Sequence, residues 1–108
     1  MILSDEAYYD LVFDPKSKFY SFGNLSKEVP VIVTSSVSKL FCVPGWRLGW
    51  MIVYNNKNYF DEFLKSVTTT TQLFLSAPTL VQAALPEMLL NTPPEFHENY
   101  KRKVKVFI

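Results

Sequence analysis

The stretch from Ser35 to Trp50, SSVSKLFCVPGWRLGW, gathers side chains that could bind an anion and carry out amine chemistry. It holds three serines, Lys39 and, eight residues later, Arg47. Hydroxyl groups together with an arginine fork are suited to a phosphate dianion. A lysine among apolar neighbours can have its amine held neutral by desolvation, or can use it to form an imine. The stretch predicts a phosphate-binding loop beside a reactive amine, with an ordinary surface lysine as the alternative.

Two acidic residues and a tyrosine stand close together in SDEAY, from Ser4 to Tyr8. Carboxylates at the end of a strand can bind a metal ion, but the chain offers no second cluster to complete a ligand shell. The single histidine, His97, lies in the charged stretch FHENYKRK, where we expect a solvated side chain. The single cysteine, Cys42, excludes an internal disulfide framework and a zinc site built from cysteine pairs. We therefore expect no metal site.

Two apolar runs are the main strand signals. Residues Val29 to Ser36 and Gly49 to Asn55 are almost continuously apolar, which is typical of strands buried on both faces. The opening MIL resembles the stub of a third strand, and turn residues such as Gly23-Asn24 punctuate the connection that follows. The serine- and lysine-containing stretch follows the first full strand directly. It therefore lies at the carboxyl end of that strand, where open α/β sheets bind their ligands.

After Asn58 the pattern becomes helical. Four apolar residues recur at helical spacing and predict an amphipathic helix: Phe60, Phe63, Leu64 and Val67. A second helix is expected from about Pro78, and Pro86 should either kink it or begin a new first turn. A third helix opens at Pro93-Pro94, with Asn91-Thr92 as its N-cap. Two or three buried strands followed by helices indicate an α/β fold.

Length and composition limit the function classes. The 108 residues are 48% hydrophobic, which argues against disorder, and their net charge of +1 gives no general reason to expect nucleic-acid binding. The basic run Lys101 to Lys103, with Lys105, is interpreted as a solvated helix face. No apolar run approaches the ~20 residues of a membrane span, and MILSDE lacks the regions of a signal peptide. We expect a cytoplasmic location, with a mitochondrial one left open.

Three motifs in this order resemble the class I aminotransferases of fold type I, which depend on pyridoxal phosphate. They are D-E-A-Y from Asp5, S-x-x-K ending at Lys39, and P-G-x-R-x-G from Pro44 to Gly49. The likeness extends through SAPTLVQAALPEMLLNTPPEF and is similar to the tyrosine aminotransferase group. It implies that residues 1–108 form the central to C-terminal part of the cofactor-binding large domain. The N-terminal part of that domain and the small domain would be absent.

The resemblance implies roles for three catalytic residues. Lys39 matches the Schiff-base lysine, whose released amine moves the proton between substrate and cofactor. Asp5 matches the carboxylate that pairs with the pyridine nitrogen, where a buried carboxylate keeps that nitrogen protonated. Tyr8 matches the phenol that hydrogen-bonds the 3′ oxygen of the cofactor. Glu6 and Tyr9 are expected to be structural.

The resemblance also implies a cup for the cofactor's phosphate. Together with Asp5, Tyr8 and Lys39, three further residues complete the implied cofactor-binding set: Ser36, Ser38 and Arg47. Arg47 would supply a planar, permanently charged fork. Pro44, Gly45 and Gly49 would shape the loop so that this arginine turns inward.

The activity implied is the transfer of the amino group of an aromatic amino acid, tyrosine, to 2-oxoglutarate by a homodimer, with no nucleic-acid or membrane partner. Two alternatives stay open. The chain alone could be an inactive truncated product or a partial gene model, because the glycine-rich phosphate loop and the arginine that clamps the substrate carboxylate lie outside it. The parent could instead catalyse another pyridoxal-phosphate reaction, as C–S lyases and aminocyclopropane-carboxylate synthases do.

Overall fold

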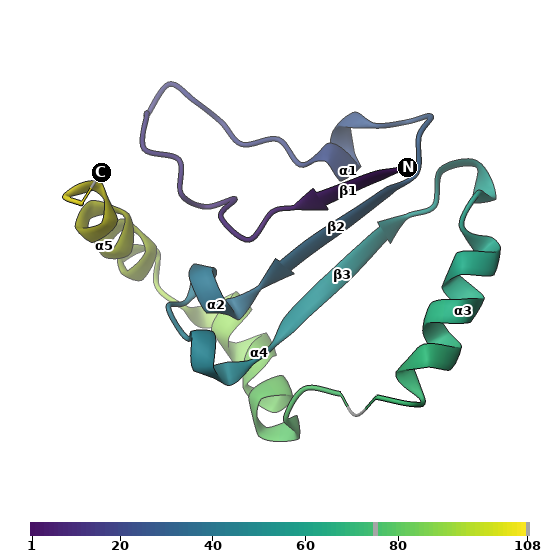
Figure 1. Cartoon of the computed structure of the whole chain (residues 1–108). Helices are drawn as coiled ribbons and strands as arrows, with labels where there is room; N and C mark the ends of the chain where they lie inside the picture. Colours follow the sequence, from purple (N-terminus) through teal and green to yellow (C-terminus); the bar gives the residue numbers. More distant parts are fainter. Residues whose placement is uncertain (75, 108) are drawn as a thin grey trace.

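A three-stranded sheet in the order β1-β2-β3 organises the chain (Figure 1). The computed structural model describes residues 1–74 and 76–107. Strand β1 (Ile2–Asp5) runs parallel to β2 (Val31–Ser36), and β3 (Gly49–Tyr54) runs antiparallel to β2. The carboxyl ends of β1 and β2 therefore meet the beginning of β3 at one end of the sheet. We call this the site end.

The central strand β2 is buried on both faces, as its sequence predicts. Val31, Ile32 and Val33 are all within the core. The strand starts at Val31 rather than Val29 because proline has no backbone N–H for the ladder, although the Pro30 carbonyl accepts a hydrogen bond from the Ile2 N–H at 3.1 Å.

The expectation that β3 is buried on both faces is wrong. Met51 is 41% exposed and Ile52 is 45% exposed. Strand β3 pairs with β2 alone among the described residues, so it stands at the edge of this sheet. An apolar run alone does not distinguish an edge strand from a central one, because both can carry the same residues.

The long connection between β1 and β2 contains one helical turn, α1 (Phe22–Leu25), where the sequence indicates only turn residues at Gly23-Asn24. Ser21 begins the turn, and its hydroxyl accepts a hydrogen bond from the Gly23 N–H at 3.2 Å. Gly23 is buried against the ring of Tyr54 at the end of β3. The helical turn thus covers the end of the sheet opposite the site end.

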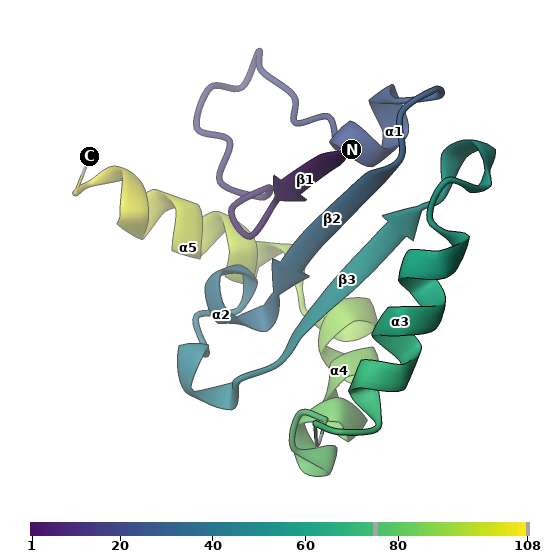
Figure 2. The same ribbon diagram turned by 45° about the vertical axis from the view of Figure 1, so that its right-hand side comes forward.

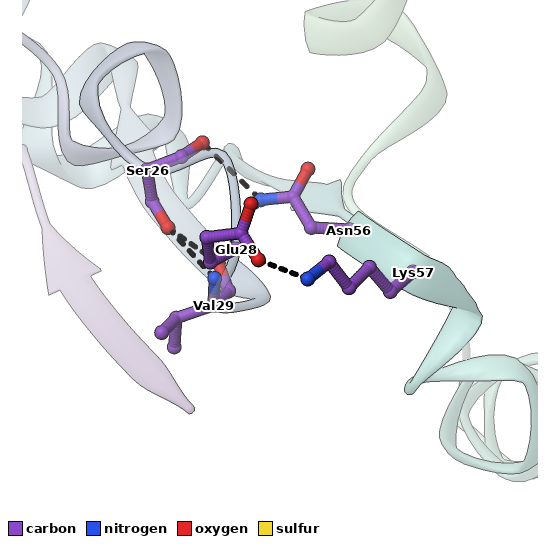
Figure 3. A network of polar contacts seen from close by, with 5 residues as sticks. All are labelled: Ser26, Glu28, Val29, Asn56 and Lys57. Carbon is purple, nitrogen blue, oxygen red and sulfur yellow. Dashed lines mark hydrogen bonds and ion pairs between the residues drawn. The ribbon is translucent and has the colours of Figure 1, made fainter.

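That opposite end is also closed by a polar network, shown in Figure 3. The Asn56 side-chain amide donates to the carbonyls of Ser26 and Val29, at 3.2 and 3.0 Å. Lys57 forms an ion pair with Glu28, and the Ser26 hydroxyl donates to the Val29 carbonyl at 2.6 Å. Strands β2 and β3 are joined covalently only at the site end, so these contacts hold their other ends together.

The site end lies directly on the core. The short helix α2 (Val37–Leu40) follows β2, and the 3-10 turn η1 (Pro44–Trp46) leads into β3. Four buried side chains of this region form one cluster: Val37, Leu40, Phe41 and Leu48. Side chains of a later helix pack against this cluster, including Val81, Leu85 and Met88.

Three longer helices follow, near the predicted positions (Figure 2). After the 3-10 turn η2 (Asn56–Asn58) come α3 (Asp61–Thr71), α4 (Thr79–Asn91) and α5 (Pro94–Lys105). Within the described residues, none of the helices has both the length and the apolar character needed to cross a bilayer.

Two details of these helices differ from the prediction. Helix α4 continues past Pro86, so this proline does not begin a new helix. The N-cap of α5 is Pro93 rather than Asn91-Thr92. Asn91 is instead the last residue of α4, and its side-chain amide donates to the Glu87 carboxylate at 2.8 Å. Helix α4 therefore ends one residue later than expected and includes Asn91, part of the expected N-cap of α5.

Replacing Gly23 with alanine should destabilise the fold, because the new Cβ would overlap the Tyr54 ring. Overpacking of this kind costs about 1–3 kcal/mol. Urea unfolding of the purified protein measures the loss. Gly45→Ala is the matched control, since its Cβ would meet nothing within 4 Å. Equal stability of the two variants would contradict the close packing of α1 on β3.

Candidate functional site

Three of the candidate residues line one hollow of about 200 Å³ at the site end. Ser36 is the last residue of β2, Ser38 lies in α2, and Arg47 directly follows η1. Leu48 and Gly49 complete the lining. Two hydroxyl groups and a guanidinium around a small hollow form a set of donors suited to a phosphate group.

Arg47 has an unusual backbone conformation. Its φ of 51° and ψ of 35° lie in the left-handed region, which is uncommon for residues other than glycine. One guanidinium nitrogen, Nη1, donates to the Pro44 carbonyl at 2.9 Å, so the loop itself fixes the direction of the side chain. Strained backbone of this kind clusters at functional sites.

The glycines of this loop contribute through space rather than through unusual backbone angles. None of the three glycines has a positive φ, and the loop turns at Cys42 and Arg47 instead. Gly45 faces open space. Gly49 matters through close approach, because a Cβ there would lie 3.0 Å from the Ser35 carbonyl oxygen and 3.3 Å from the Ser36 Cβ. Its missing side chain lets β3 start tightly against the end of β2.

Lys39 and Tyr8 come together from different parts of the chain. The Lys39 ammonium lies 5.7 Å from the centroid of the Tyr8 ring, within cation–π distance. Of the two alternatives for Lys39, a desolvated amine and a surface lysine, the structure shows an exposed side chain. Val37 and Leu40 occupy the inward positions of the short helix α2, so Lys39 points outward and is exposed. The amine is thus accessible to a small molecule.

Asp5 ends β1 opposite Thr34 of β2. Its carboxylate oxygen Oδ1 accepts a hydrogen bond from the Ala7 N–H at 3.1 Å, which begins the turn that leads to Tyr8. The side chain is exposed, not buried as the sequence analysis expects. Within the described part of the chain, no hydrogen bond joins Asp5 to the other five candidate residues. It shares the site end with them through the strand pairing.

Glu6 is the buried carboxylate of this region. It is 7% exposed, and its Oε1 accepts hydrogen bonds from the Ser4 and Ser21 hydroxyls, both at 3.0 Å, and from the Phe22 N–H at 3.1 Å. These contacts tie the end of β1 to the start of α1. They fix the backbone from which the Asp5–Tyr8 turn departs.

The expectation of a solvated His97 is wrong. Its side chain is only 22% exposed. The ring packs against Phe41 with centroids 5.5 Å apart and against Phe96 at 5.3 Å. One face of α5 thus turns toward the site end.

Lys101 is also less solvated than expected, because its ammonium lies 3.2 Å from the Asp10 carboxylate. Burial by itself would lower the pKa of Lys101, but the hydrogen bonds and charges of Asp10 and Glu98 outweigh it and raise the pKa. Asp10 is not among the residues predicted from the sequence. His97 and Lys101 are four residues apart, which places both on one face of a helix. The neighbouring sequence does not indicate which part of the chain that face contacts.

A family model described as aminotransferase class I and II matches residues 1–105 of this chain. Among curated relatives, tyrosine aminotransferase from Bos taurus is 39% identical over 99 residues, which are 91% of this chain and 22% of that protein. A cystine lyase from Arabidopsis thaliana is 34% identical over 97% of this chain and 25% of that protein. The chain spans about a fifth to a quarter of the length of the curated relatives it matches.

Among solved structures, tyrosine aminotransferase from Leishmania infantum superposes with a TM-score of 0.88. The sequences are 27% identical, and the match covers 96% of this chain and 28% of that chain. The expected α/β fold is therefore confirmed.

Replacing Glu6 with alanine should lower the stability of the fold, because two hydroxyls and one backbone N–H would lose their acceptor. These donors are only partly buried, so the loss should be about 1 kcal/mol, the lower end of the cost of a buried donor without a partner. Thermal unfolding followed by circular dichroism measures the change. Glu62→Ala on α3, whose side chain is 89% exposed, is the control and should change the midpoint little. A Glu6→Ala variant as stable as this control would exclude the anchoring role.

Proposed function

The chain belongs to the class I and II aminotransferase family, and from this premise we propose that its site end holds pyridoxal phosphate in an enzyme that moves the amino group of tyrosine to 2-oxoglutarate. The observation that carries the proposal is the hollow lined by Ser36, Ser38 and Arg47, with the Lys39 amine exposed on the same short helix as Ser38. Residues 1–108 would form the central to C-terminal part of the cofactor-binding large domain.

The hollow suits the phosphate of this cofactor. A guanidinium has five N–H donors. The contact from Nη1 to the Pro44 carbonyl uses one of them and orients the group, which leaves others for phosphate oxygens. The Ser36 hydroxyl makes no N-cap hydrogen bond to α2, so it can donate to the anion. Charge-assisted hydrogen bonds of this kind are stronger than neutral ones.

Lys39 is the proposed catalytic amine. When bound, pyridoxal phosphate supplies a carbonyl carbon that reacts with amines and a ring that accepts electrons. The Lys39 amine would hold the cofactor, and after its release it would carry the proton taken from the Cα of the substrate. The Tyr8 ring, whose centroid lies 5.7 Å from the Lys39 amine, would donate its phenol hydrogen bond to the 3′ oxygen of the cofactor.

Asp5 is the proposed partner of the ring nitrogen. Its Oδ1 holds the Ala7 N–H and so fixes the carboxylate at the end of β1, which leaves Oδ2 for a protonated nitrogen. The carboxylate is exposed here, and a cofactor stacked at the site end would cover it. An acidic group shielded from water in this way favours the protonated, electron-accepting ring.

The substrates and assembly rest on the comparisons and the surface. The relatives named as tyrosine aminotransferases support tyrosine as amino donor, and 2-oxoglutarate follows from the resemblance. Several large apolar side chains remain exposed, including Leu3, Leu80 and Leu90. These side chains could contact a partner subunit or the rest of the domain, and the homodimer itself follows from the resemblance. A cytoplasmic location stays a prediction from the sequence.

A lyase reaction is the second candidate, because the cystine lyase matches this chain almost as well as the tyrosine aminotransferases do. A lyase breaks a C–S bond, expels the sulfur-containing fragment and, with water, releases ammonia and pyruvate, whereas an aminotransferase passes the amino group to a 2-oxo acid. The two candidates share the cofactor site and differ in their substrates and products.

Incubation of the complete protein with pyridoxal phosphate, tyrosine and 2-oxoglutarate should yield the keto acid of tyrosine and glutamate without release of ammonia. Lys39→Ala should abolish this transfer and the near-visible absorbance of lysine-bound cofactor, because Lys39 is the lysine that α2 carries beside the hollow. Lys65→Ala on α3, with a side chain 73% exposed, is the control and should keep both. Ammonia released from cystine would instead select the lyase, and an unchanged band in Lys39→Ala would exclude Lys39.

Arg47→Met should weaken the binding of pyridoxal phosphate by about tenfold or more, because hydrogen bonds to charged groups contribute about 1.5–3 kcal/mol. Binding of pyridoxal, which lacks the phosphate, should be unchanged in the same variant. Arg102→Met on α5 is the matched control. Fluorescence titration with the two ligands measures both affinities, and an equal loss for pyridoxal would show that Arg47 does not act on the phosphate.

A further inference from the structure

Helix α5 contributes none of the proposed site residues, yet it contacts both segments that carry them. Asp10 lies two residues after Tyr8, and its carboxylate faces α5. The Lys101 ammonium is 3.2 Å from Oδ1, and the His97 Nδ1 is 3.6 Å from Oδ2. Asp10 is 30% exposed and the other two side chains are 22% exposed. Their attraction is therefore less screened by water than that of a surface pair.

The Asp10 Oδ2 and the His97 Nδ1 are both buried, and neither has a hydrogen-bond partner in the part of the chain described here. At 3.6 Å, each of these two atoms is placed to become the hydrogen-bond partner of the other. A small approach of the loop to α5 would convert this contact into a charge-assisted hydrogen bond.

The same histidine contacts the other segment. Its ring packs edge-on against Phe41, which directly follows α2 and lies two residues after Lys39. Phe41 is 6% exposed and also packs against Phe96 at 6.4 Å. A displacement of α5 would therefore move Phe41 and, with it, the end of α2.

The next turn of α5 adds a third contact. The pKa of Tyr100 is raised, first by burial and then by the neighbouring Cys42 and Tyr8. Cys42 follows Phe41, and the two line one hollow with Phe96 and Tyr100. One face of α5 thus lies along both the Tyr8 turn and the residues that follow α2.

We propose that Asp10 and His97 are positioning residues, and that through them α5 braces the Tyr8 turn against α2 so that the Tyr8 ring stays beside the Lys39 amine. The catalytic relevance of this arrangement rests on the proposed function, whereas its geometry rests on the contacts described above. Neither Asp10 nor His97 touches the amine. Their effect on it passes through Tyr8 and Phe41.

The brace can be tested without cofactor, through the rate at which an acylating reagent modifies the Lys39 amine, followed by mass spectrometry of its peptide. Tyr8→Leu removes the ring, so the change in acylation rate of this variant is the largest that the brace can produce. We expect the rate to increase by about two- to fivefold, as for loss of an exposed cation–π contact. Asp10→Asn and His97→Ala should reproduce this increase although they leave Tyr8 in place.

Two further variants separate positioning from general loss of structure. Asp14→Asn makes the same change four residues later in the loop, on an exposed carboxylate that accepts hydrogen bonds from the Lys16 N–H and the Ser17 hydroxyl. The charge of Lys105 on α5 acts on this carboxylate, but, among the described residues, none of its hydrogen bonds goes to α5. Asp14→Asn should leave the rate unchanged. Asp10→Glu keeps the carboxylate, so its acylation rate should stay near that of the unmodified protein. This comparison can be made even if Asp10→Asn folds poorly.

The double variant Tyr8→Leu with Asp10→Asn gives the decisive comparison. If Asp10 acts through Tyr8, the double variant should react no faster than Tyr8→Leu alone, since coupled residues are not additive. Additive increases, or an unchanged rate in folded Asp10→Asn and His97→Ala, would overturn the brace. Failure of the proposed function would appear separately, as absence of lysine-bound cofactor in the unmodified protein.

Discussion

Parallel pairing of β1 with β2 is the constraint on which the candidate site depends. The register sets Asp5 opposite Thr34, so the Asp5–Tyr8 turn leaves the sheet at the end where Ser36 and α2 begin. A parallel pair needs a long crossover, and here residues 6–30 supply it without a long helix. The buried Glu6 carboxylate anchors the start of that crossover, and the contacts around Asn56 hold the opposite end of the sheet. Separate sets of contacts therefore hold the two ends of the sheet.

Core packing determines which side chains of α2 remain available for chemistry. Val37 and Leu40 pack into the cluster formed with Leu48, and this orientation forces Lys39 outward. Exposure of the amine is thus a consequence of burial of its neighbours. The same loop holds Arg47 in a left-handed conformation, which L-residues adopt at a cost. The packed core on one side and the tight start of β3 at Gly49 on the other sustain that strain.

Much of this arrangement follows from local sequence. The apolar run of β2 and the helical spacing after Asn58 predict elements close to those found, because periodicity reports the buried face of each element. The hollow at Ser36, Ser38 and Arg47 is also local, since these residues lie within one connection. The exposure of β3 and the burial of His97 were not predictable, because each depends on what stands beside an element rather than on its own residues.

The two halves of the site therefore differ in how they are maintained. The hollow lined by Ser36, Ser38 and Arg47 is formed within residues 36–49, by the segment that joins the paired strands β2 and β3. The approach of Tyr8 to Lys39 instead requires β1, the crossover and the contacts of α5, which are far apart in sequence. Contacts of long sequence range carry a larger loop-closure cost. Loosening of the structure should then separate Tyr8 from the amine before it opens the hollow, so phosphate affinity and amine reactivity report on different parts of the fold.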